Sequence, residues 1–177
     1  MLSFDEIVGQ RAAVELLQGL LGTDRIPHAM LLQGPEFVGK ATIAGAFAAA
    51  LLCDKAEAAH CGQCASCQLL GRCNHPDFLV IGRLTKDEAK KDKTRLNTEI
   101  ADAPEADLGA QILIDQIRTL NGLVGLTPRK GRRRVFIIDP ADRLNPAAQN
   151  ALLKTLEEPP ERSVLILVTS RPHVLLP

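Results

Sequence analysis

Apolar residues along this chain fall into short runs and into helically spaced sets, separated by polar, glycine-containing and proline-containing turns. Buried strands are predicted at residues 28–32, 78–81, 135–138 and 163–168. Amphipathic helices are predicted over residues 7–21 and 112–126. This alternation predicts an α/β fold, with a doubly wound parallel sheet flanked by helices and a ligand site at the carboxyl ends of the strands.

Two further helices carry more specific signals. The segment from Lys40 to Leu52 is apolar almost all round, so the helix should be buried against the sheet. The other begins after Asn145, a good N-cap followed by proline at the first helical position, and ends before Pro159 and Pro160.

The first predicted strand is followed by a glycine-containing loop that opens the apolar helix. The loop, residues 34–40, reads Gly-Pro-Glu-Phe-Val-Gly-Lys, and its strand–loop–helix context is that of a P-loop. Backbone amides of such a loop cradle phosphate oxygens, and Lys40 adds a positive charge. The predicted nucleotide contacts are Gly34, Pro35, Gly39, Lys40, Ala41 and Thr42, together with Ile7 and Val8 near the N-terminus.

Two groups needed for ATP hydrolysis are missing from this pattern. Ala41 stands where a magnesium-coordinating P-loop has a Ser or Thr hydroxyl, and Thr42 is one position late. Residues 135–139 form a buried strand that ends in the carboxylate of Asp139, as in a Walker B motif, but Pro140 replaces the Glu that would polarise water. The sequence therefore predicts a site that binds ATP without hydrolysing it, or a relic that binds no nucleotide.

Composition narrows the class of protein. The chain has 177 residues, 46% of them hydrophobic, and is predicted to form one domain over residues 1–177. Its formal net charge is zero, so no overall basic field attracts nucleic acid. The longest nearly apolar run, residues 41–53, is too short to cross a bilayer, and the first ten residues do not resemble a signal peptide. We therefore expect a cytoplasmic protein without membrane contact.

Five cysteines in a reducing compartment point to metal binding or free thiols. Cys61, Cys64 and Cys67 are spaced as metal ligands, and Cys53 at the end of the apolar helix is the favoured fourth ligand of a structural zinc ion. Cys73 is the alternative fourth ligand. The other interpretation is a set of free buried thiols. The zinc module is predicted to span residues 53–75.

Charged segments divide the rest of the chain. Residues 82–110 are predicted to be a mobile insertion, in which the run of both charges at residues 86–95 is a solvated loop. The basic residues between 129 and 134 could contact DNA phosphates, but a solvated turn that protects an adjacent strand edge is favoured.

The P-loop, the cysteine module and a long string at residues 145–160, Asn-Pro-Ala-Ala-Gln-Asn-Ala-Leu-Leu-Lys-Thr-Leu-Glu-Glu-Pro-Pro, strongly resemble the clamp-loader subunits of bacterial DNA polymerase III, an AAA+ family. The resemblance covers nearly the whole chain except the insertion. Ala41 and Pro140 favour the family's delta prime type over its gamma/tau ATPase type.

This resemblance implies a RecA-like AAA+ domain and a stator role in the ring that loads the sliding clamp onto primed DNA. It implies gamma/tau and delta subunits as partners, with the clamp and DNA contacted through the assembled ring. It also makes Thr169 a sensor-like residue and places the family's arginine finger just beyond Pro177. A competing hypothesis is an active ATPase in which Asp142 or Glu36 replaces the missing Glu.

Overall fold

Four parallel strands form the central sheet of this protein, which we describe from a computed structural model. Their order across the sheet is β1-β4-β3-β2, with β1 at Ala29–Gln33, β2 at Phe78–Ile81, β3 at Arg134–Ile138 and β4 at Ser163–Thr169. The structure describes all residues except 1–2, 56–58, 93–95, 98–106, 159 and 176–177. The predicted α/β fold with a parallel sheet is confirmed.

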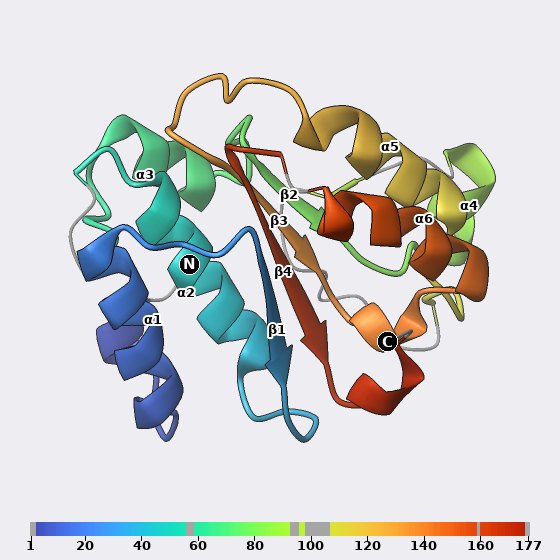
Figure 1. Cartoon of the computed structure of the whole chain (residues 1–177), viewed down its shortest axis with the longest axis horizontal. Coiled ribbons are helices and arrows are strands. Elements are labelled where there is room, and N and C mark those ends of the chain that lie inside the picture. The colour runs from blue at the N-terminus through green and yellow to red at the C-terminus, as the bar shows by residue number, and fades with distance from the viewer. Residues whose placement is uncertain (1–2, 56–58, 93–95, 98–106, 159, 176–177) are drawn as a thin grey trace.

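Helices cover both faces of the sheet (Figure 1). One face carries α1 (Arg11–Thr23), α2 (Lys40–Leu52) and the short α3 (Ala65–Gly71), and the other carries α5 (Ile114–Val124) and α6 (Pro146–Glu157). Short 3-10 helices lie at Phe4–Glu6, Ala141–Arg143 and Pro172–Val174.

Side chains of β3 alternate between two hydrophobic cores. Val135 and Ile137 join the core under α2, whereas Phe136 and Ile138 join the core under α5 and α6. All residues of β3 and β4 are buried. Burial on both faces explains why these strands read as continuous apolar runs instead of alternating ones.

The helix boundaries agree with the sequence patterns at the starts of α2 and α6, whereas α5 is two residues shorter at each end than the predicted 112–126 and the first helix begins later than predicted. The α2 and α6 helices begin at the predicted residues, and the Asn145 side chain accepts a hydrogen bond from the Ala148 amide, at 2.7 Å. The first helix, however, begins at Arg11 instead of Ile7, because Gly9 has a positive φ of 84° that an α-helix does not admit. Ile7 precedes the helix in an extended conformation.

The charged run after β2 contains a helix that the sequence analysis missed. Helix α4 spans Lys86–Lys91, so the prediction of a solvated loop is wrong for these residues. Thr85 and Glu88 form a capping box: the Glu88 amide donates to the Thr85 hydroxyl at 3.2 Å, and the Thr85 amide donates to the Glu88 carboxylate at 2.9 Å. Residues 93–95 and 98–106 of the predicted mobile insertion lie outside the described residues.

The basic turn between α5 and β3 is held by a buried carboxylate. Asp77 accepts hydrogen bonds from the amides of Arg129, Lys130 and Gly131 at 2.7, 2.7 and 3.0 Å. Its Oδ1 also lies 3.4 Å from Nε of Arg134. Burial opposes ionisation of Asp77, but the three amides and the guanidinium outweigh it and hold its pKa below the usual range.

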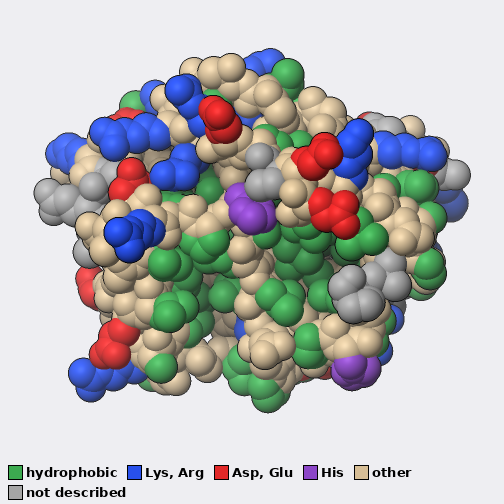
Figure 2. All heavy atoms as spheres, in the orientation of Figure 1, with side chains coloured by type: hydrophobic (Ala, Val, Ile, Leu, Met, Phe, Trp, Pro, Cys, Tyr) green, Lys and Arg blue, Asp and Glu red, His purple; other side chains and the backbone are tan. Residues whose placement is uncertain are grey.

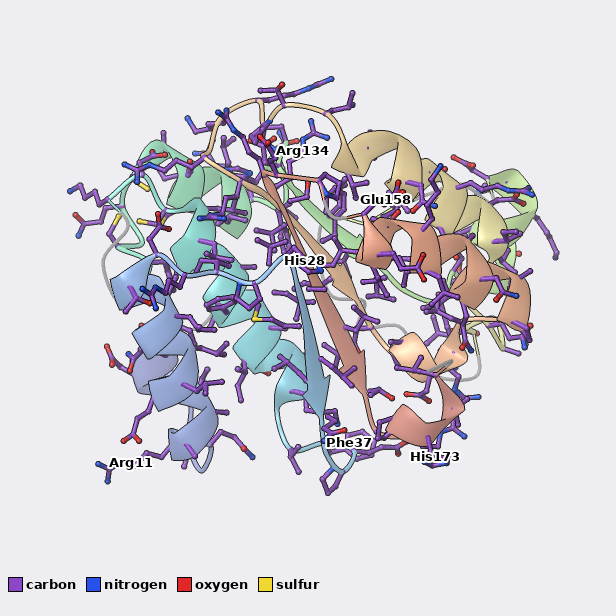
Figure 3. The ribbon with its side chains drawn as sticks, viewed as in Figure 1. Arg11, His28, Phe37, Arg134, Glu158 and His173 are labelled. Carbon is purple, nitrogen blue, oxygen red and sulfur yellow. The ribbon has the colours of Figure 1, made fainter. Side chains whose placement is uncertain are left out.

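The solvated-turn interpretation is therefore wrong for Arg134, whose side chain is only 4% exposed in its ion pair with Asp77. Arg133 also has a partner, since its Nη2 lies 3.1 Å from the Asp24 carboxylate. Figure 2 shows Lys and Arg side chains gathered along the edge of the molecule over this turn, interspersed with acidic ones. Figure 3 places Arg134 at the end of the sheet opposite the P-loop.

We expect Asp77→Ala to lower the free energy of unfolding by about 3 kcal/mol at pH 7, because it leaves Arg134 buried without its counter-ion. Urea unfolding measures the change. Since the pKa of Asp77 is depressed by folding, its contribution is present above the ordinary value of 3.8 and is lost as pH falls through the lower folded value. The difference in free energy of unfolding between the unaltered protein and Asp77→Ala should therefore shrink in acid.

The matched control is Asp87→Ala on α4, where the carboxylate is 84% exposed and a change of less than about 0.5 kcal/mol is expected. A loss of less than 1 kcal/mol in Asp77→Ala would contradict a central role for the Asp77 network.

Candidate functional site

The loop between β1 and α2 has the backbone form of a phosphate-binding loop. Gly39 is the N-cap of α2 and has a φ of 88°, which favours glycine. No side chain caps the helix there, so the amides of its first turn face the loop. Phe37 at the loop tip is 99% exposed (Figure 3). This arrangement can bind an anion through backbone amides.

Lys40 folds back over the loop. Its Nζ donates hydrogen bonds to the carbonyl oxygens of Gly34 and Pro35 at 2.9 and 2.5 Å. The positive charge therefore lies at the centre of the loop, where a bound phosphate would compete with these two carbonyls for the ammonium. Ala41 and Thr42 follow on the first turn of α2 and are both half-buried.

The two predicted N-terminal contacts lie in different surroundings. Ile7 is partly buried against the core formed with α1 and α2, whereas Val8 is 93% exposed. A residue that the sequence analysis missed, Gln10, connects this segment to the loop by donating from Nε2 to the carbonyl of Val38 at 3.1 Å. No sequence signal marked Gln10, since a glutamine before a helix is common on protein surfaces.

Asp139 directly follows β3 and faces the P-loop charge. Burial raises its pKa to about 6, an effect that Lys40 and Arg83 reduce and Asp142 increases. A carboxylate that binds a metal ion at a strand end would have this position. Here burial disfavours the ionised form of Asp139, which is the form that a metal ion requires. Pro140 follows it and offers neither a base nor an amide donor.

Asp142 is a buried carboxylate whose ion-pair partner at the end of β4, Arg171, is 45% exposed. Its Oδ1 accepts the Thr169 hydroxyl at 2.8 Å, and its Oδ2 accepts Nη2 and Nε of Arg171 at 2.7 and 3.1 Å. Burial opposes ionisation, but Arg171 and Thr169 outweigh it and lower the pKa of Asp142. Both carboxylate oxygens are therefore engaged by side chains of the strand end.

This network connects the strand ends. Thr169, the predicted sensor-like residue, is fully buried with its hydroxyl directed to Asp142. The hydroxyl of Ser170 lies 3.5 Å from the carboxylate of Glu36 in the P-loop. No sequence signal marks the Asp142–Arg171 pair, because the two residues are far apart in sequence and no motif links them.

The cysteine module gathers four sulfur atoms. The Sγ atoms of Cys53, Cys61, Cys64 and Cys67 all lie within 4.8 Å of one another. Two of the separations, Cys53 to Cys64 and Cys61 to Cys67, are 3.8 and 3.9 Å. Tetrahedral zinc with bonds of about 2.3 Å needs sulfur separations of about 3.8 Å, so the set fits a metal ion of this kind.

The surroundings of these thiols also suit metal binding. The amides of Cys61, Cys64 and Cys67 point at the sulfurs of Cys53, Cys61 and Cys64 respectively, each at 3.4 Å. Hydrogen bonds from the amides of Gln63 and Cys64 lower the pKa of Cys61 to about 6. Burial raises the pKa of Cys67 to about 12, so the thiolate is disfavoured. A bound cation would offset this by stabilising the thiolate. Cys73 is not a member of the four-sulfur cluster.

The fold is a parallel α/β domain with a glycine-containing loop between β1 and α2 and an attached four-cysteine cluster. The family model for "DNA polymerase III, delta subunit" matches residues 9–177. The chain belongs to this family of DNA polymerase III clamp-loader subunits, which includes delta' and gamma/tau.

Curated relatives agree with this assignment. The chain is 41% identical over 151 residues to DNA polymerase III subunit delta' of Pseudomonas aeruginosa, covering 85% of this chain and 39% of the relative. It is 34% identical over 171 residues to subunit tau of Bacillus subtilis, covering 96% of this chain and 26% of the relative. The chain thus spans less than half the length of these relatives.

A solved structure confirms the fold. The gamma subunit-related protein from Thermotoga maritima aligns with a TM-score of 0.51 and 22% sequence identity, over 93% of this chain and 42% of that one. Among the described residues, no helix has the length and apolarity needed to span a membrane.

We expect Asp139→Asn to raise the free energy of unfolding by about 1–2 kcal/mol at pH 8. A carboxyl whose pKa is raised by folding disfavours the folded state once the pH exceeds its ordinary value of 3.8, and fully so above about 6. The gain should therefore disappear at pH 4, as measured by urea unfolding at both values.

Asp142→Asn is the matched comparison, because the pKa of that carboxyl is shifted downward instead. It should destabilise the protein at pH 8. Equal effects of Asp139→Asn at pH 4 and pH 8 would contradict the described environment of Asp139.

Proposed function

We propose that this chain is the nucleotide-binding-type domain of a non-hydrolysing, delta prime-type subunit of the clamp loader. The observation that carries this proposal is the combination of an intact phosphate loop with Ala41 and Pro140 at the positions of the metal-binding hydroxyl and the catalytic Glu. Such a domain is a stator: it holds its place in the ring and leaves ATP turnover to its neighbours.

The environment of Asp142 supports this choice over an active gamma/tau-type ATPase. To replace the missing Glu, Asp142 would have to accept a proton from water. Its two oxygens are instead occupied by Thr169 and Arg171, and its lowered pKa makes it a weaker base. Glu36, the other candidate, is an exposed side chain of the loop itself. Neither is arranged as a water-polarising group.

ATP binding without hydrolysis is the second part of the proposal. The loop amides and Lys40 supply phosphate contacts, but Ala41 gives magnesium no hydroxyl ligand. Among the predicted contacts, residues 34–42 form the loop and the start of α2. Ile7 packs against the core under α2, and exposed Val8 would reach a nucleotide only from outside that core. Thr169 would act through Asp142 and not directly on phosphate.

The partners follow from the same assignment. Gamma/tau and delta subunits would flank the domain in a cytoplasmic ring, which opens the sliding clamp and loads it onto primed DNA. The family's stator completes a neighbour's ATP site, so its effect on turnover is visible only in the assembled complex. A structural zinc ion held by Cys53, Cys61, Cys64 and Cys67 is the proposed cofactor.

Calorimetric titration with magnesium and ATP, with phosphate release assayed in the same sample, tests the nucleotide proposal. We expect no release above the protein-free rate, because both the metal-binding hydroxyl and the base are absent. Any binding heat should disappear in Lys40→Ala. Steady release that is lost in Asp139→Ala would overturn the stator assignment in favour of an active ATPase.

Metal analysis tests the zinc proposal. We expect about one zinc ion per chain, and its removal by a chelator should lower the free energy of unfolding by about 4 kcal/mol, the linkage expected at a thousandfold excess over Kd. Cys67→Ser should abolish stoichiometric zinc, whereas Cys73→Ser should retain it. Zinc retained by Cys67→Ser and lost by Cys73→Ser would show that the ligand set is wrong.

A further inference from the structure

A polar link between Asp54 and Ser66 crosses the cysteine module, and the Asp54 carboxylate also has a hydrogen bond to the side chain of Cys64. The Asp54 carboxylate, one residue after Cys53, accepts the hydroxyl of Ser66 at 2.6 Å through Oδ1. Its Oδ2 accepts the backbone amide of the same serine at 3.3 Å. Ser66 is fully buried, whereas Asp54 is exposed at the surface of the module. The pair therefore spans from the end of α2 to the first turn of α3.

The position of this link matters because it joins the two ligand-bearing segments. Cys53 is the C-cap of α2, and Cys64 is the N-cap of α3, with Cys67 on the first turn. Ser66 lies between the latter two in sequence. Fixing Asp54 to Ser66 therefore fixes the Cys53 sulfur relative to the Cys64 and Cys67 sulfurs, and Cys53 lies 3.8 Å from Cys64.

We propose that Asp54 is a positioning residue of the metal site, which through Ser66 holds Cys53 against the ligands of α3 before the metal arrives. This inference rests on the proposed function in one respect, namely that the four cysteines bind zinc. The link lowers the conformational entropy that the chain loses when the ion joins Cys53 to Cys64 and Cys67. Groups that orient metal ligands in this way commonly change affinity by 10- to 100-fold.

The charge of Asp54 acts in the opposite direction, which makes the inference testable. Zinc bound by four thiolates leaves a net charge of about −2 at the site. A carboxylate close to that charge weakens thiolate formation by repulsion. If Asp54 acted only through its charge, its removal would tighten metal binding, whereas removal of a positioning group loosens it.

Zinc affinity is measured by competition with a chromophoric chelator, and Co²⁺ absorption reports the tetrahedral geometry. We expect Asp54→Ala and Ser66→Ala each to weaken zinc binding by about 10- to 100-fold. Asp54→Asn, which keeps an acceptor for the Ser66 hydroxyl, should lie between Asp54→Ala and the unaltered protein. The double variant Asp54→Ala/Ser66→Ala should be little weaker than Asp54→Ala, because both changes break one link.

Asp87→Ala and Cys73→Ser are the matched controls and should leave zinc affinity unchanged. Circular dichroism at saturating zinc checks that each variant folds, and Ser66→Ala is the milder change, since alanine suits the first turn of α3.

The possible results separate the two proposals. Unchanged or tighter zinc binding in both Asp54→Ala and Ser66→Ala would overturn the positioning role, as would additive losses in the double variant. Absence of stoichiometric zinc in the unaltered protein would overturn the zinc proposal itself, and the positioning role with it. Weaker binding in both single variants without further loss in the double variant supports the positioning role.

Discussion

Strands β3 and β4 are buried on both faces along their whole lengths, and the positions at which they end determine the site. Their parallel register pairs Ile138 with Leu167, so Asp139 and Thr169 emerge at the same edge of the sheet. The β1 strand joins β4 in register at Gln33 and Thr169, which brings the P-loop to that edge. Because burial on both faces fixes this register, the site depends on core packing more than on its own polar contacts.

At that edge the two carboxylates have opposite environments. Asp142 is neutralised within the chain by Arg171, whereas Asp139 is buried near Lys40 and Arg83 and has a pKa of about 6. In a magnesium-dependent site the ion would supply the positive charge that such a carboxylate needs. Here the chain supplies cations of its own and lacks the hydroxyl at position 41. This charge balance supports the proposal of a domain that keeps the fold of the site without its metal chemistry.

Most of the fold could be predicted because it rests on local signals. The strands follow from apolar runs, α6 from the Asn145 cap and Pro146, and the cysteine cluster from its spacing. Helix α4 was also marked locally, by Thr85 and Glu88, but its high charge favoured a loop interpretation. The Arg134–Asp77 ion pair could not be predicted in this way, because its partners lie far apart in sequence and meet only after the sheet has formed.

Helix α2 connects the two candidate sites, since Gly39 caps its N-terminus and Cys53 ends it. Its thirteen residues form a rod of about 20 Å that is buried along most of its length. The cysteine module is anchored to the domain by Leu70 of α3, which packs into the core under α2, and by the contact between Asp54 and Ser66. The proposed zinc ion would add a further cross-link. Loosening the module would free the carboxyl end of α2 but leave the phosphate loop held by the sheet. The module therefore lies at the end of α2 opposite the candidate phosphate loop, away from the Asp139 and Asp142 carboxylates.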